Sequence, residues 1–127
     1  MMCARAQRLD SISVAKRVYE AYVAKNRDAI EALIADDFHF TSPRDNRLDR
    51  ATYFSRCWPN AHITNEFTFV HLVPDGDRVF VTYDLRLKDG SAFRNTEILT
   101  IREGKLVEAQ VFFGWTIPHG APEGNSI

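Results

Sequence analysis

The sequence has few cysteines, no surplus charge of either sign and no long hydrophobic run. Its two cysteines, Cys3 and Cys57, form no Cys-x-x-Cys pair and no cluster with histidine, so their spacing offers neither a disulfide framework nor a zinc site. Sixteen lysines and arginines nearly balance seventeen aspartates and glutamates, which gives no net field for nucleic acid or an anionic membrane. No apolar run approaches the length of a membrane span, and the N-terminus lacks the hydrophobic segment of a secretion signal.

These absences narrow the expected class of protein. The four histidines are far apart, and none has a partner four residues away, so we expect no metal site. We also expect no cofactor, no nucleic-acid or membrane partner, and a cytoplasmic location. A chain of 127 residues suits one domain over residues 1–127, with loose ends at about 1–8 and 118–127. The aromatic content of 12% indicates a core or cavity lined with rings.

The N-terminal half carries helix signals. Apolar residues at helical spacing predict a helix over about 11–25, with Asp10 as its N-cap. Asn26 can cap a second, shorter helix, which the "ADD" segment at 35–37 closes. Asp49 offers a further N-cap, and Pro59 stops that third helix, whose aromatic stripe we expect to form a lid over a cavity.

The remaining segments alternate with the period of a strand. "FHFTS" at 38–42 predicts a short strand with Phe40 and Ser42 on one face, followed by a polar loop, "PRDNR". Turn sequences at 74–77, 88–91 and 102–105 then predict a meander of four strands, at about 63–73, 78–88, 91–102 and 105–115.

Helices followed by a curling antiparallel sheet predict an α+β domain. We expect the N-terminal helices to pack on the concave face of a curved, mainly antiparallel sheet, in a cone-shaped, cystatin-like roll. The space between the helices and the long, twisted strands is where a small hydrophobic molecule would bind.

Three stretches resemble the nuclear transport factor 2 superfamily, which includes ketosteroid isomerase and the SnoaL-like polyketide cyclases. They are "YEAYVAKNRDAIEALIADDF", "FTSP" and "TEILTIREGKLVEAQVFFGW", and the likeness covers residues 11–117. The stretch "FTSPRDNRLDRATYFSRCWPN" resembles a SnoaL-like subgroup with no assigned activity. The resemblance implies the conical fold and places Glu97 at the isomerase's second acid. It also places Ser42 at the isomerase's general base and Val18 at its oxyanion tyrosine, so that constellation is incomplete here.

Glu97 is the most informative residue, because alternation over 93–101 puts it in a largely apolar row with Leu99 and Ile101. A carboxylate on a cavity wall loses hydration in its charged form, which predicts a raised pKa unless a cation compensates. Two interpretations stay open. Glu97 is a general acid or base, or it is a structural anchor hydrogen-bonded to Trp58, a tyrosine or an arginine.

Tyr83 and Asp45 are the other catalytic candidates. Tyr83 lies on the apolar face of its strand, where it either donates to an oxyanion or only completes the core. Asp45 is the nearest carboxylate to the missing base, although its setting is also typical of an Asx turn. The predicted ligand contacts lie on the inward faces of the expected elements: Tyr19, Tyr22, Phe40, Ser42, Trp58, Asn95, Val111 and Phe113.

Two functions fit this pattern. The first is a cofactor-free isomerase, cyclase or dehydratase acting by acid–base chemistry on a small hydrophobic molecule, which is the repertoire that the resemblance implies. The second is a non-catalytic domain that binds a ligand or a partner protein. Either would be a homodimer through the outer sheet face, where we expect Phe80, Val70, Leu72 and Phe112.

Overall fold

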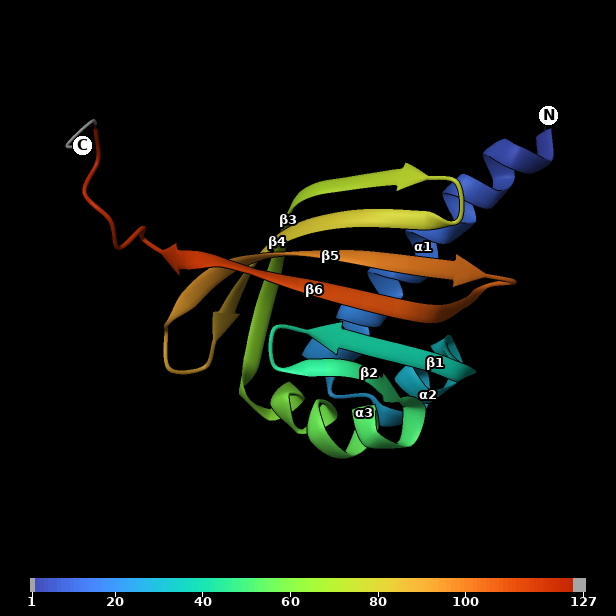
Figure 1. Ribbon diagram of the computed structural model, residues 1–127, viewed down its shortest axis with the longest axis horizontal. Helices are drawn as coiled ribbons and strands as arrows, with labels where there is room; N and C mark the ends of the chain where they lie inside the picture. The colour runs from blue at the N-terminus through green and yellow to red at the C-terminus, as the bar shows by residue number, and fades with distance from the viewer. Residues whose placement is uncertain (1, 125–127) are drawn as a thin grey trace.

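The computed structural model describes residues 2–124, with the backbone alone for 2–10. Its elements follow the chain in this order (Figure 1): α1 (Met2–Ala24), α2 (Arg27–Leu33), β1 (Ile34–Ser42), β2 (Asp45–Asp49), α3 (Arg50–Arg56), the 3-10 helix η1 (Trp58–Ile63), β3 (Thr64–Asp75), β4 (Arg78–Leu87), β5 (Ala92–Arg102) and β6 (Lys105–Ile117).

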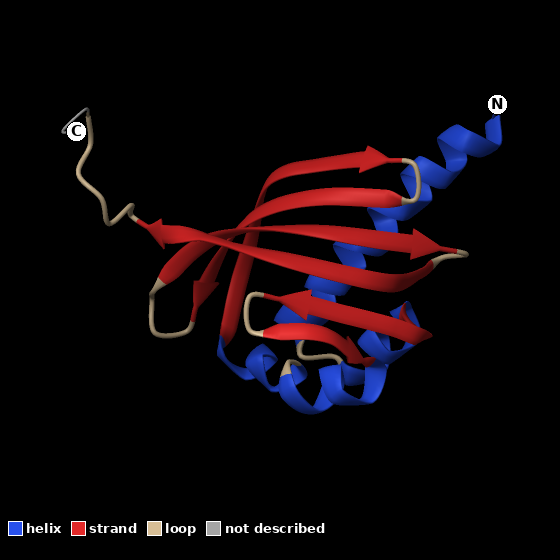
Figure 2. Ribbon diagram, in the orientation of Figure 1, coloured by secondary structure: helices blue, strands red, loops and turns tan. Residues whose placement is uncertain are grey.

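One curved sheet holds all six strands, in the order β2-β1-β6-β5-β4-β3. Every neighbouring pair is antiparallel except β1 and β6, which run parallel. The α1 helix crosses behind the sheet and packs on β3, β4 and β5, while α2, α3 and η1 gather at one end (Figure 2). This arrangement confirms the predicted α+β class, with helices against one face of an open, mainly antiparallel sheet.

The core lies between α1 and the inner face of the sheet. Along β4, Val79, Val81 and Tyr83 are buried, as the strand period predicts, and on β5 Leu99 lies among them. The α1 helix contributes Val14, Ala15, Val18 and Tyr19, and α2 contributes Ile30. None of the described helices is long and apolar enough to cross a membrane.

Two of the three predicted caps are confirmed, and one is wrong. Asn26 accepts a hydrogen bond from the Ala29 amide, and Asp49 accepts one from the Thr52 amide. Asp10 caps nothing, because α1 begins at Met2 and residue 10 lies inside it. Residues 2–9 are mostly Ala, Arg, Gln and Leu, all strong helix formers, so nothing in this segment stops the helix.

The segment between α2 and α3 also differs from expectation. The β1 strand begins at Ile34, directly after α2, so the "ADD" segment belongs to a strand, and the second half of the predicted polar loop forms the start of β2. Residues Asn46 and Arg47 of β2 are exposed at the edge of the sheet. The polar side chains of this short edge strand are typical of a loop. Only its backbone pairing with β1 identifies it as a strand.

The expected outer sheet face needs one correction. A bulge in β3 between Phe69 and His71 shifts the alternation, so that Leu72 pairs with the buried Val81 and packs against the core. Phe80 lies between two buried neighbours and therefore faces outward. Val70 and Phe112 are exposed, and Val73 joins them as a further exposed apolar residue.

Candidate functional site

A cavity of about 560 Å³ lies between the helices and the inner face of the sheet, within the usual range for small-molecule sites. The predicted catalytic residues Glu97, Tyr83 and Asp45 all line it. The predicted ligand contacts that line it are Tyr19, Tyr22, Phe40, Ser42, Asn95, Val111 and Phe113. Whether these residues bind or catalyse stays a prediction.

Trp58 is not among the lining residues. Its ring packs against Tyr22, with 4.9 Å between centroids, at the start of η1. The expected hydrogen bond between its indole and Glu97 is therefore absent. The chain turns into η1 at this position, which directs the indole toward α1 rather than across the cavity.

Glu97 faces the cavity because β5 keeps its alternation. Phe93, Asn95, Glu97 and Leu99 all line the cavity, and Glu97 pairs with the buried Val81 of β4. The residue as a whole is partly buried, and it forms part of the cavity wall together with Tyr19 and Tyr83. The sequence therefore predicted the orientation of this side chain correctly.

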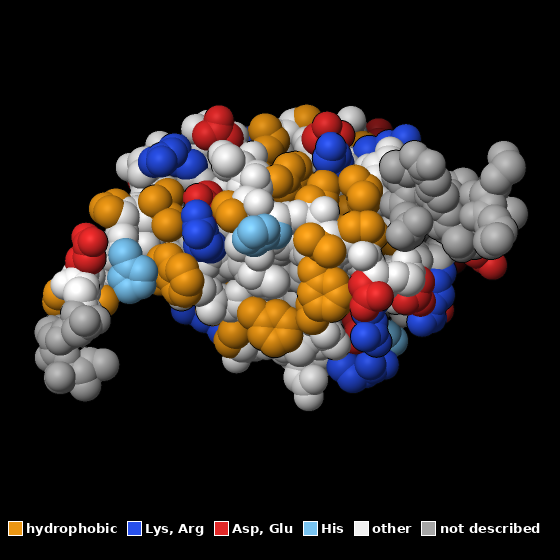
Figure 3. Space-filling model, turned by 90° about the horizontal axis from the view of Figure 1, so that it is seen from above, with side chains coloured by type: hydrophobic (Ala, Val, Ile, Leu, Met, Phe, Trp, Pro, Cys, Tyr) orange, Lys and Arg blue, Asp and Glu red, His pale blue; other side chains and the backbone are white. Residues whose placement is uncertain are grey.

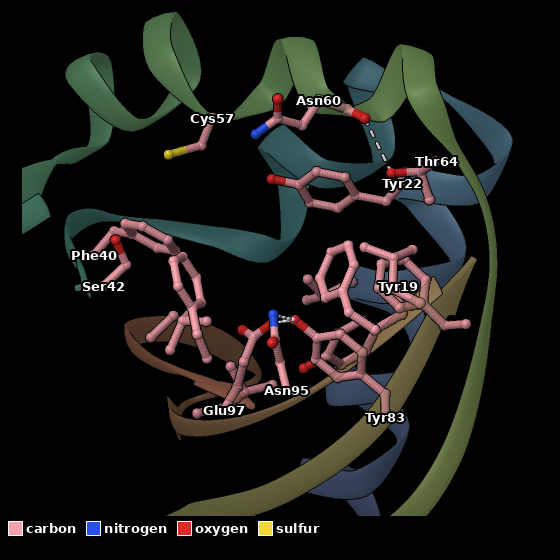
Figure 4. Close-up of a pocket in the computed structure, with 18 of the residues that line it drawn as sticks. Tyr19, Tyr22, Phe40, Ser42, Cys57, Asn60, Thr64, Tyr83, Asn95 and Glu97 are labelled. Atoms are coloured by element: carbon pink, nitrogen blue, oxygen red, sulfur yellow. Dashed lines mark hydrogen bonds between the residues drawn. The ribbon is translucent and has the colours of Figure 1, made fainter. Parts of the chain in front are cut away.

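Tyrosine hydroxyls, not a cation, surround the Glu97 carboxylate (Figure 4). The Tyr83 hydroxyl donates a hydrogen bond of 2.7 Å to Oε2. The Tyr19 hydroxyl lies nearby, is buried, and has no hydrogen-bond partner in the described part of the chain. No described Lys, Arg or His forms an ion pair with Glu97.

Burial raises the pKa of Glu97 from 4.5 to about 7, because the charged form loses hydration. The Tyr83 and Tyr19 hydroxyls favour the charged form and offset only part of this effect. Burial and the nearby Glu97 both raise the pKa of each tyrosine well above its ordinary value, so both stay protonated donors. At neutral pH Glu97 therefore populates its acid and base forms together.

A chain of hydrogen bonds fixes the direction in which the Tyr83 proton points. The Gly114 amide donates to Asn95 Oδ1 at 3.2 Å, which orients the Asn95 amide group. Asn95 Nδ2 then donates to the Tyr83 oxygen over a longer distance of 3.4 Å. Because that oxygen accepts from Asn95, its own proton is free to go to Glu97.

Gly114 is a positioning residue that the sequence analysis missed. A Cβ at this position would lie 2.2 Å from the Arg94 carbonyl oxygen, so only glycine permits this approach of β6 to β5. The pairing of the two strands shifts between Phe93 and Asn95, opposite this glycine. A lone glycine inside a predicted strand is a signal for a bulge and could have revealed it.

A second polar group lies at the helical end of the cavity. The hydroxyls of Tyr22, from α1, and Tyr53, from α3, are hydrogen-bonded to each other, and both residues line the cavity. Burial raises the pKa of both tyrosines, so the pair stays uncharged. No sequence pattern predicts this contact, since the two residues are far apart in the chain.

Asp45 lines the cavity wall but has partners for both oxygens. Ser42 Oγ donates to Oδ2 at 2.9 Å, and Arg56 lies 2.8 Å from Oδ1 in an ion pair. Ser42 also accepts from the Arg44 amide, as expected of a residue that stabilises the loop. Among the described side chains, no three His, Cys, Asp or Glu residues gather closely enough to hold a metal ion.

The arrangement of helices, sheet and cavity is shared with known proteins. A model of the SnoaL-like domain matches residues 15–109, three-quarters of the chain. The chain belongs to the SnoaL-like family. The search of curated proteins returned no match.

Solved structures of the nuclear transport factor 2 superfamily share the fold of this SnoaL-like domain. A protein from Kribbella flavida, provisionally named a ketosteroid isomerase, is 18% identical with a TM-score of 0.73 over 94% of this chain and 87% of that one. An LEH-like epoxide hydrolase of M. tuberculosis is 14% identical, with a TM-score of 0.70 over 84% of both chains. A provisionally named polyketide cyclase from Xanthomonas campestris is 17% identical, with a TM-score of 0.69 over 85% of this chain and 93% of that one. At these identities the likeness establishes the fold alone.

Proposed function

We propose that this SnoaL-like protein binds a small, mostly apolar molecule in its cavity and transforms it by cofactor-free acid–base chemistry centred on Glu97. The observation that carries the proposal is a carboxyl group on the cavity wall that accepts from Tyr83, has a pKa of about 7 and is neutralised by no described cation. A general acid or base is most effective when its pKa lies near the working pH. A purely structural anchor needs no such value.

The hydrogen bonds around Glu97 suggest how it acts. Tyr83 donates to Oε2, so a proton on the carboxyl group resides on Oε1 and is available to a ligand oxygen. The Tyr19 hydroxyl, which lies near Glu97 and has no hydrogen-bond partner among the described residues, is a further donor that stabilises the carboxylate once its proton has left. After giving up its proton, the carboxylate takes one back from a ligand carbon, which restores the protonated carboxyl group.

This one-carboxyl cycle suits isomerisation, aldol-type cyclisation or dehydration of a carbonyl or hydroxyl compound. The provisional names of two structural neighbours, ketosteroid isomerase and polyketide cyclase, fall in the same group of reactions. Asp45 has a lesser role in this scheme, because Arg56 and Ser42 occupy its oxygens. We expect Asp45→Asn to reduce turnover less than Glu97→Gln does.

The test begins with the carboxyl group itself. Infrared difference spectra between pH 3 and pH 9 should show a protonated carboxyl band that titrates near pH 7 and is absent in Glu97→Gln. A panel of cyclic ketones, enones and hydroxyketones is then screened for turnover. Glu97→Gln should lower any activity by about 100-fold or more, the usual contribution of general acid–base catalysis.

Glu66→Gln is the matched control, because Glu66 is exposed on β3 and the same atoms change. It should retain full activity. A Glu97 band that titrates near pH 4.5, or turnover that survives Glu97→Gln, would contradict the enzymatic proposal. Binding of a panel member without turnover would instead support the non-catalytic alternative.

We also propose that the protein is a homodimer through its outer sheet face. Phe112 of β6 is 53% exposed, and Val73 and Val70 of β3 are 51% and 37% exposed. Seen from above, hydrophobic side chains gather among polar ones over β3 and β4 (Figure 3). Apolar side chains on an otherwise uncovered sheet face suit contact with a second copy of the chain.

A further inference from the structure

The cavity carries polar groups at two opposite ends. In Figure 4 the carboxyl, amide and hydroxyl groups of Glu97, Asn95 and Tyr83 lie on one side, and Tyr22 and Asn60 lie on the other. Between them the cavity wall is apolar, with lining residues Val18, Phe67, Leu99, Leu106 and Ala109. A ligand that fills this space therefore meets hydrogen-bonding groups at both of its ends.

The Tyr22–Tyr53 pair leaves hydrogen-bonding capacity unused. Each tyrosine hydroxyl can donate one hydrogen and accept others. When one hydroxyl donates to the other, the accepting hydroxyl keeps its own hydrogen. Neither hydroxyl has another hydrogen-bond partner among the residues that the structure describes. The pair therefore presents one spare donor, with lone pairs beside it, at a position that lines the cavity.

The surroundings of the pair determine what kind of group it would hold. Asp45 and Arg56, near the same end, neutralise each other in an ion pair. Tyr53 is buried, and placing an unpaired charge against it is strongly unfavourable, because the charge would lose its hydration. An uncharged oxygen, which can both accept from and donate to a hydroxyl, avoids that cost.

We propose that the Tyr22–Tyr53 hydroxyl pair forms a second binding subsite, which takes an uncharged hydroxyl or carbonyl group at the end of the ligand opposite Glu97. The ligand is then an apolar molecule with two oxygen functions, such as a hydroxyketone or a diketone. This inference rests on the proposed function, because it treats the cavity as the ligand site.

Two probes that differ by one oxygen test the subsite. They are 4-cyclohexylcyclohexanone, with one ketone, and 4-(4-hydroxycyclohexyl)cyclohexanone, with a hydroxyl at the far end. Isothermal titration calorimetry on the wild-type protein should give a dissociation constant about three- to tenfold lower for the hydroxyketone, the effect of one net hydrogen bond.

Variants of the two tyrosines test whether their hydroxyls cause the preference for the hydroxyketone. The double variant Tyr22→Phe/Tyr53→Phe removes both hydroxyls and should abolish this preference, whereas either single variant keeps one hydroxyl and part of the preference. Tyr83→Phe is the control at the other end of the cavity, and it should raise the dissociation constants of both probes by the same factor. If the double variant does not fold, the two single variants decide: an undiminished preference in both of them would overturn the subsite.

The outcomes distinguish this inference from the function on which it rests. Equal affinity of the wild-type protein for the two probes would overturn the subsite and leave the proposed function standing. A preference that persists in the folded double variant would also overturn it. Failure of both probes to bind would count against the cavity as a ligand site, and the subsite would fall with it.

Discussion

At the scale of single residues, the Glu97 carboxyl holds its proton more tightly in the folded chain than in the unfolded chain. Its pKa is about 7 when folded and near 4.5 when unfolded. Between these two values, raising the pH ionises Glu97 only in the unfolded state, so the free energy of unfolding falls as the pH rises. The contribution to stability is complete below pH 4.5 and is lost as the pH passes 7, a change of about 3 kcal/mol.

Glu97→Gln should remove this dependence, because the amide does not titrate and can still accept from Tyr83. We expect the variant and the wild-type protein to have similar stability at pH 4. At pH 8 the variant should be more stable, by up to about 3 kcal/mol. Urea denaturation across pH 4 to 8 measures the difference. Parallel stability curves would show that the carboxyl group is solvated in the folded protein.

At the scale of elements, the junction of β5 and β6 holds the polar network in place. The β6 backbone approaches β5 at Gly114 more closely than any side chain allows, and the same amide orients Asn95. Asn95 in turn contacts Tyr83, and Tyr83 contacts Glu97. The spacing between β5 and β6 therefore influences the direction in which the Tyr83 hydroxyl donates its proton to Glu97.

Gly114→Ala should separate these strands and destabilise the protein by roughly 1–3 kcal/mol, the usual cost of forcing an extra carbon into a closely packed site. The pKa of Glu97 should shift as well, because the network loses its orientation. Gly120→Ala is the matched control, since a Cβ there would meet only Thr116 Oγ1, at 3.7 Å. Its effect should stay within about 0.5 kcal/mol. Equal effects of the two substitutions in thermal denaturation would contradict this account.

At the scale of the whole molecule, the outer sheet face determines the predicted assembly. Phe112 lies on β6, in the interior of the sheet, and its side chain is half exposed. Phe112→Lys places a charge at the proposed interface and should convert a dimer to a monomer in sedimentation equilibrium. Val23→Lys changes an exposed apolar residue of α1 and should leave the dimer intact. A wild-type protein that sediments as a monomer would refute the proposed assembly.

The sequence by itself determined the features that depend on near neighbours. The three turn sequences set the antiparallel order from β3 to β6, because each turn joins strands adjacent in the chain. Asn26 and Asp49 cap helices through contacts with residues three positions later. Alternation directed Glu97 inward, because the strand period fixes which face a side chain occupies.

Only the tertiary structure decided the features that join distant segments. The β1 strand pairs with β6 in parallel, and the hydroxyls of Tyr22 and Tyr53 meet across 31 positions of the chain. No local pattern encodes such contacts, since they depend on how whole elements pack. The environment of Glu97 is of the same kind. Its direction follows from strand geometry, but its pKa follows from the tyrosines and apolar walls that packing places around it.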